Sequence, residues 1–167
     1  MPRRLSHATE HRPPTLDRVS NRRIFTIERS AVARCAPEVV MAKIKRPATW
    51  PEWQSEITEA HGPDVIASGD VVRGRAEMMG FDVDGQSVTE AMDGSSLSQD
   101  VVVGVGMRIR YTVTETAEGT TVTHQLVSEL PAGTLGVLLS FFLRRRLQKM
   151  QRMLLEELVA QAEASSG

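Results

Sequence analysis

Apolar residues at the C-terminal end of the chain follow the repeat of one long amphipathic helix. Across residues 135–164 they recur at steps of three and four, which places them along one face of an α-helix. Residues 135–143 are apolar on more than one face, because Phe141 and Phe142 widen the stripe. One neighbouring helix of ordinary length cannot cover this much apolar surface, so we expect the helix to pack against a sheet.

Most of the preceding chain alternates between apolar and polar residues, which is the period of half-buried β-strands. Asp-Gly at 93–94 and Glu-Gly at 118–119 are typical of hairpin turns, and a further turn is expected at 84–85. Because these turns are short, neighbouring strands should pair antiparallel. The expected strands cover residues 24–34, 55–60, 70–79, 81–92, 97–105, 107–116 and 120–130.

Two short helical segments follow the first strand. Pro37 stands near the first turn of one segment, Glu38 lies at its positive end, and Pro47 terminates it. Trp50 and Trp53 belong to a second segment, and Trp50 is expected to pack both segments onto the sheet. This order of elements predicts an α+β fold, in which a curved antiparallel sheet of about seven strands wraps around the C-terminal helix.

Composition and charge narrow the function classes. The net charge is −1 over 167 residues, so bulk electrostatics favour neither nucleic acid nor an integral membrane position. Cys35 is the single cysteine, which excludes an intrachain disulfide and favours a reducing, cytoplasmic location. Residues 1–23 carry six arginines and two acids, and we expect a flexible basic arm there, ahead of one domain over 24–164. Neither a secretory signal nor a bilayer-spanning stretch is recognised.

Several short motifs occur in a characteristic order. They are APEVV at 36–40, WPEW at 50–53, Gly-Asp at 69–70, Gly-Phe at 80–81 and the closing amphipathic helix. Together they resemble the helix-grip fold of the START/Bet v 1-like (SRPBCC) superfamily. More narrowly, the chain resembles the bacterial polyketide cyclase/dehydrase and lipid transport families. It departs from many relatives at Met41 and across residues 43–47.

The resemblance implies a cavity between the sheet and the long helix. Such a cavity would bind a hydrophobic small molecule, such as a lipid, polyketide or isoprenoid-like compound, in a carrier or sequestering protein without a cofactor. Met side chains on the predicted strands fit an adaptable apolar lining, or equally an ordinary core. Trp53 is a candidate for the pocket mouth. The side chains expected at the ligand are Trp53, Val72, Met78, Phe81, Val83, Met92, Val103, Ile109, Tyr111, His124, Leu126, Leu135, Leu138, Leu139 and Phe142.

His124 and Tyr111 are the candidates for chemistry, as acid/base groups of a polyketide cyclase or dehydratase. His124 could act as a general base, or it could be a core histidine bonded to a neighbour. Tyr111 could donate to a ligand carbonyl or fill the core. If the 118–119 turn fixes the hairpin, the numbers of two residues that face each other across it add up to about 237. Tyr111 then lies opposite Leu126 and one step from His124. Glu90 is either a pocket carboxylate or the sign of an exposed edge strand.

Other site types lack support in the sequence. No cysteine and histidine cluster has metal-ligand spacing, and no phosphate-binding glycine motif follows a strand. We expect no nucleic-acid partner, at most transient membrane contact, and a monomer or homodimer. Within the long helix, Phe142 is expected to grip the ligand, while the half from Leu147 to Leu158 closes the core. Substitution of Phe142 should therefore change ligand selection, and that of Leu154 should mainly cost stability.

Overall fold

The computed structural model describes residues 23–78, 80–130 and 134–167, with the side chains of all of these except Arg23, Met78, Leu130 and residues 134–140. The arm expected over residues 1–23 therefore lies, apart from Arg23, outside the described residues. In chain order the elements are β1 (Arg23–Ala33), α1 (Pro37–Ile44), the 3₁₀ helix η1 (Pro47–Thr49), α2 (Trp50–Trp53), β2 (Ile57–His61), β3 (Val71–Met78), β4 (Phe81–Met92), β5 (Ser96–Val103), β6 (Val105–Thr116), β7 (Gly119–Leu130) and α3 (Thr134–Ala164).

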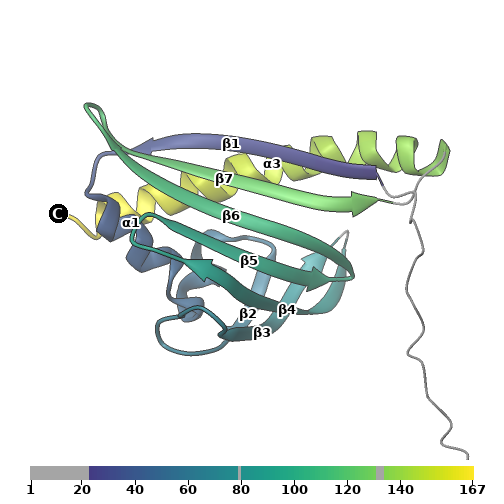
Figure 1. Ribbon diagram of the computed structural model, residues 1–167, viewed down its shortest axis with the longest axis horizontal. Helices are drawn as coiled ribbons and strands as arrows, with labels where there is room; N and C mark the ends of the chain where they lie inside the picture. Colours follow the sequence, from purple (N-terminus) through teal and green to yellow (C-terminus); the bar gives the residue numbers. More distant parts are fainter. Residues whose placement is uncertain (1–22, 79, 131–133) are drawn as a thin grey trace, which may run out of the picture.

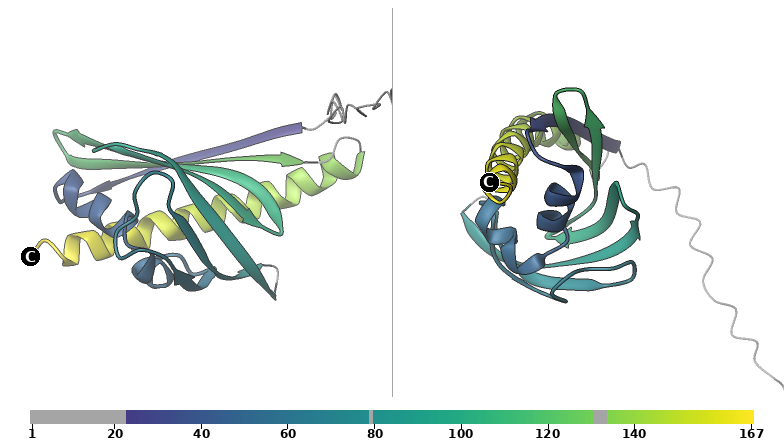
Figure 2. Two further views of the ribbon diagram at one scale, coloured as in Figure 1. Left: turned by 60° about the horizontal axis from the view of Figure 1, so that its bottom comes forward. Right: turned by 90° about the vertical axis from the view of Figure 1, so that its left-hand side faces the viewer.

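The described strands form one antiparallel sheet in the order β1-β7-β6-β5-β4-β3-β2 (Figure 1). The sheet curls, and α3 lies along its concave side next to β1 and β7 (Figure 2). The short helices α1 and α2 occupy one end of the concave space, beside the C-terminal end of α3. The predicted α+β helix-grip architecture is thereby confirmed, including the long C-terminal helix.

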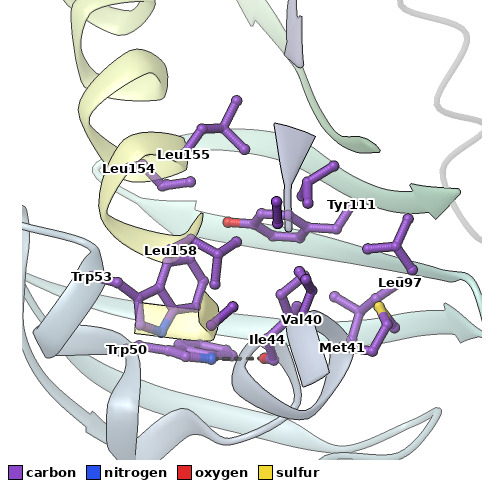
Figure 3. Close-up of a cluster of buried hydrophobic side chains, with 14 of the residues drawn as sticks. Val40, Met41, Ile44, Trp50, Trp53, Leu97, Tyr111, Leu154, Leu155 and Leu158 are labelled. Atoms are coloured by element: carbon purple, nitrogen blue, oxygen red, sulfur yellow. Dashed lines mark hydrogen bonds between the residues drawn. The ribbon is translucent and has the colours of Figure 1, made fainter. Parts of the chain in front are cut away.

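A dense core fills the end of the concave space that α1 and α2 occupy, and we call this end the closed half (Figure 3). Trp50 anchors it, because its indole Nε1 donates to the carbonyl oxygen of Ile44 at 2.9 Å. Leu154 and Leu158 of α3 are buried in the same core, as predicted for this half of the helix. The other large side chains of the closed half include Val40, Met41, Ile44, Trp53, Ile66, Val72, Leu97, Tyr111, Val113, Val122 and Leu155.

One expected turn is absent, and another lies at a different residue. Asp84 and Gly85 are not a turn: they lie inside β4, paired with Arg75 and Gly74. The β3–β4 turn contains Gly80, between the expected strands 70–79 and 81–92, and its φ of 84° is the left-handed conformation that glycine adopts without strain. Likewise Gly104, with φ of 69°, separates β5 from β6, one residue before the expected end of the strand.

A β-bulge in β4 decides which of its side chains face inward. The pairing with β5 shifts between Thr89 and Ala91, so the extra residue Glu90 points to solvent. The alternation alone would put Glu90 in register with Val88 and Met92, but the bulge breaks this register: Met92 pairs with Leu97 on the concave face, whereas Glu90 is exposed. Glu90 is neither a pocket carboxylate nor a sign of an edge strand, because β4 lies between β3 and β5.

The hairpin of β6 and β7 is confirmed, but its register differs from the expected one. Thr116 pairs with Gly119, so facing positions sum to 235 rather than 237. Tyr111 consequently lies directly opposite His124, instead of opposite Leu126. The two-residue slip keeps each side chain on its predicted face, since the strand period is also two.

Candidate functional site

The part of the concave face remote from α1 and α2 has a different lining, and we call it the open half. Its wall consists of the aliphatic side chains Val83, Val101, Val103 and Met107, which point inward and are only half-buried. Val83, Val101 and Val103 belong to β4 and β5, whereas α3 packs against β1, β7, α1 and α2. Met107 of β6 also packs against the buried cluster that contains Leu147 of α3. The cavity expected between sheet and helix would lie here. Residues 134–140 begin α3, and their side chains lie outside the described part of the chain.

Polar side chains lie at the inner end of the open half. Ser87, Thr89 and Gln99 all point to the concave side and are buried. The amide Nε2 of Gln99 donates to the Thr89 hydroxyl at 3.5 Å, a long hydrogen bond. The Ser87 hydroxyl has no hydrogen-bond partner among the described residues, although it is excluded from solvent. A buried hydroxyl without a partner is costly, so this position is suited to a polar atom of a bound molecule.

His124 and Tyr111 form the polar group at the border between the two halves. Their ring centroids are 4.7 Å apart, and Trp53 meets Tyr111 edge to face at 6.1 Å. From α3, the amide Nε2 of Gln151 lies 2.9 Å from His124 Nδ1 and donates to the His124 carbonyl at 3.1 Å. Nδ1 thus accepts the amide proton, which assigns the imidazole proton to Nε2.

Burial sets the protonation of this pair. Desolvation lowers the pKa of His124 to about 4, so its imidazole is neutral at pH 7. Burial likewise raises the pKa of Tyr111 above its ordinary value, so its phenol also stays neutral. A neutral imidazole of such low pKa is a weak base, and Nε2 of His124 is buried without a hydrogen-bond partner among the described residues. As arranged, the pair can offer hydrogen bonds more readily than it can remove protons.

The predicted ligand residues whose side chains are described lie in three environments. Val72 and Leu126 are buried, and Val83, Met92, Val103 and Ile109 are half-buried on the concave face. Phe81 and Phe142 are exposed, with 73% and 64% of their surface accessible. The side chains of Met78, Leu135, Leu138 and Leu139 lie outside the described part of the chain.

The predicted position of Trp53 is wrong. It does not lie at a pocket mouth but inside the closed half, where 1% of its surface is accessible. The reason is that α2 packs against β2 and α3, which turns the indole toward Tyr111. A ligand contact of Trp53 would require a molecule that reaches this core.

Sequence reasoning missed the inward polar residues Ser87, Thr89, Gln99 and Gln151. Gln99 could have been found, because it alternates in phase with Leu97 and Val103 on the same strand. Ser87 and Thr89 could also have been found, because they alternate in phase with Val83; the bulge follows Thr89 and turns Met92 inward, and this shift has no signature in the alternation. Gln151 sits among apolar neighbours on the buried stripe of α3, a polar break in the helical pattern that was available in the sequence.

Across residues 23–78, 80–130 and 134–167, no three His, Cys, Asp or Glu side chains gather closely enough to hold a metal ion. Within the same ranges, no helix combines the length and the apolar character needed to cross a membrane.

Comparison with known families gives one match over most of the chain. Residues 25–163 match the family model described as polyketide cyclase / dehydrase and lipid transport. No curated protein sequence matches the chain.

Solved structures share the fold at low sequence identity. The di-domain ARO/CYC StfQ from the steffimycin biosynthetic pathway superposes with a TM-score of 0.73 at 16% identity, over 86% of this chain and 52% of StfQ. The Zhui aromatase/cyclase from Streptomyces sp. R1128 gives 0.66 at 12% identity, over 84% and 94%. Ara h 8.0201 gives 0.62 at 8% identity, over 84% and 99%. At these identities the likeness establishes the fold alone.

Proposed function

Because the chain belongs to the polyketide cyclase/dehydrase and lipid transport family, we propose that it binds a hydrophobic small molecule between the sheet and α3. The protein acts as a carrier or sequestering protein for this molecule, in the cytoplasm. The family and the helix-grip neighbours support either hydrophobic ligand binding or a cyclase role. The choice between the two rests on the chemistry of the interior.

One observation carries the carrier function: the half-buried aliphatic wall of Val83, Val101, Val103 and Met107. Leaving inward aliphatic groups in contact with water costs about 25 cal/mol for each Å². An apolar ligand placed on this wall removes that surface from water and recovers the free energy. The buried hydroxyl of Ser87 and the Thr89–Gln99 pair then offer hydrogen bonds to an oxygen at one end of the ligand. A lipid, polyketide or isoprenoid with one polar end has this character.

Two neighbouring valines of β5 provide a matched test. Val101 points into the open half, whereas Val102 points outward with 61% of its surface accessible. Native mass spectrometry of the protein from its own host should detect a retained apolar ligand. In Val101→Trp the larger side chain should occupy the ligand space and abolish retention, while Val102→Trp should retain the ligand. Equal retention by both variants would contradict the proposed location.

A second function, polyketide cyclase or dehydratase, is favoured by the unpartnered Nε2 of His124 beside Tyr111. In this mechanism the two groups would hold and polarise a carbonyl while the chain folds onto itself for aldol closure. The low pKa of His124 argues against proton removal by its imidazole at neutral pH, and its complete burial argues against contact with a substrate carbonyl.

Turnover distinguishes the two functions. The carrier function predicts no conversion of a poly-β-ketone thioester, and largely intact ligand binding in His124→Asn and Tyr111→Phe. If conversion is observed and falls by about 10²-fold or more in both variants, as for loss of an acid/base group, the cyclase function is correct.

A further inference from the structure

One flank of α3 carries a hollow lined by cations on the outside of the molecule. The hollow has a volume of about 270 Å³ and is lined by Arg29 of β1 and by Arg145, Gln148, Lys149 and Arg152 of α3. Every one of these side chains is a hydrogen-bond donor, and none of the lining residues in the described part of the chain is an acid. A chain with a net charge of −1 thus concentrates four positive charges at one place.

Exposed aromatic rings continue the same flank toward the beginning of α3. Phe141 and Phe142 are 61% and 64% exposed, and their rings meet edge to face at 5.8 Å. The guanidinium of Arg145 lies over the Phe141 ring at 5.8 Å, so the aromatic pair and the basic hollow touch each other. Phe141, Arg145 and Arg152 are separated by four and seven residues, which places them on one side of the helix.

The opposite side of α3 is already occupied. Leu147, Gln151, Leu154 and Leu158 are buried against the sheet and the short helices. The helix therefore presents two different stripes, one packed into the protein and one of phenylalanine and basic residues facing outward. We propose that this outward stripe docks the protein on the surface of an anionic lipid bilayer. The stripe consists of Phe141, Phe142, Arg145, Lys149 and Arg152 of α3, together with the adjacent Arg29 of β1.

The combination of residues selects this partner. A bilayer interface accepts exposed rings at the level of the acyl boundary, while phosphate headgroups pair with arginine and lysine around them. A nucleic acid would use the cations but would not require the solvent-exposed Phe142. The Arg152–Glu156 pair, at 3.8 Å on the exposed surface, is weak and can yield to a phosphate. The inference concerns the outer surface of the protein and holds whether or not the interior binds a ligand.

Vesicle flotation of the full chain tests the proposal. The protein should float with vesicles of phosphatidylcholine and phosphatidylglycerol, and only weakly with phosphatidylcholine alone. Rising salt should reduce the bound fraction, because it screens exposed charges. Since each basic residue near an anionic surface contributes about fivefold to partitioning, Arg145→Glu with Lys149→Glu should reduce it by at least about 25-fold. Phe141→Ser with Phe142→Ser should reduce it as well.

Matched variants outside the stripe serve as controls. Arg73→Glu removes an exposed cation from β3, and Val65→Ser removes an exposed apolar side chain from the loop before it. Both should bind vesicles like the unaltered chain, and circular dichroism melting should show that all variants fold. Unchanged vesicle binding by the two stripe variants would overturn the proposal and assign any binding to another part of the chain.

Two competition results would also overturn it. Displacement from vesicles by glycerol phosphate at equal phosphate concentration would indicate a site for a free phosphate compound. The protein could also bind poly-glutamate but not vesicles. If Phe141→Ser with Phe142→Ser left this binding to poly-glutamate intact, the partner would be an acidic protein. Persistence on vesicles in the presence of glycerol phosphate supports docking on the bilayer.

Discussion

The closed and open halves of the concave face are built by the same sheet, yet they bury their side chains to different degrees. In the closed half Leu97, Tyr111 and Val122 are covered by α1, α2 and the C-terminal part of α3, and at most 2% of their surface is accessible. In the open half Val101 and Val103, on the same strand as Leu97, stay half-buried. An inward side chain is therefore buried only where a second layer covers it. The short helices supply this layer at one end, and α3 supplies it along β1 and β7, where Phe25, Ile27 and Leu126 pack with Leu147.

The two halves also differ in the polar groups they contain. At the border, His124 receives a hydrogen bond from Gln151 of α3, so its polar atoms are partly satisfied within the protein. In the open half Ser87 lacks any such partner among the described residues. We interpret the His124–Gln151 contact as a feature of the fold, and the Ser87 hydroxyl as a position for a polar atom of a ligand.

Truncation of Trp53 should have the largest effect on the closed half. Trp53→Ala removes a fully buried indole that contacts Tyr111, and such changes cost about 3–5 kcal/mol. Urea unfolding followed by circular dichroism measures the free energy of unfolding. Val102→Ala, on the exposed face of β5, is the control and should change it by less than about 0.5 kcal/mol. A loss below about 1 kcal/mol in Trp53→Ala would mean that the closed half is loosely packed.

Protonation of His124 should destabilise the border between the halves. The pKa of His124 is lowered from 6.5 to about 4 in the folded protein, so the unfolded chain binds the proton more tightly. The free energy of unfolding therefore has its full value above pH 6.5. It decreases as the pH falls toward 4, by about 3 kcal/mol in total. Urea unfolding at a series of pH values measures this decrease. The slope between pH 6.5 and 4 should be reduced in His124→Asn, and an unchanged slope would assign it to other groups.

A pair of valines tests the difference between the halves directly. Val122→Ala deletes two methyl groups in the closed half, which should cost about 2 kcal/mol, including the cavity left behind. Val103→Ala deletes the same groups from the half-buried wall and should cost less than about 1 kcal/mol. Ligand retention should respond in the opposite order, with the larger loss in Val103→Ala. Equal losses of stability would show that the open half is a closed core.

Truncation of Phe142 should have the smallest effect on stability. Phe142→Ala removes a ring with 64% of its surface accessible, so the free energy of unfolding should change by no more than about 0.5 kcal/mol. The expectation from the sequence is that ligand selection changes, while the docking proposal expects weaker vesicle binding. Ligand profiling by native mass spectrometry and vesicle flotation, applied to this one variant, separate the two. A loss of stability near that of Trp53→Ala would show that the ring is part of the core.

Much of the architecture could be read from the sequence, because it follows from local patterns. The steps of three and four across residues 135–164 indicated α3, and the alternation of Met107, Ile109 and Tyr111 identified the inner face of β6. Glycine pairs predicted some turns correctly and one wrongly. An Asp-Gly pair at 84–85 suits a turn, but both residues lie inside β4, since the turn at Gly80 already lets β4 pair with β3 along its length.

The candidate site was predicted only in part, for reasons that involve distant residues. The sequence by itself determined which side chains face inward along most strands, because alternation and strand geometry share one period. Only the tertiary structure decided which stretch of that face is covered. Trp53 became core because α2 packs between β2 and α3, and His124 became a weak base because burial excludes water from its ring. Coverage depends on elements far apart in the chain, and hydrophobic periodicity carries no information about which of them will meet.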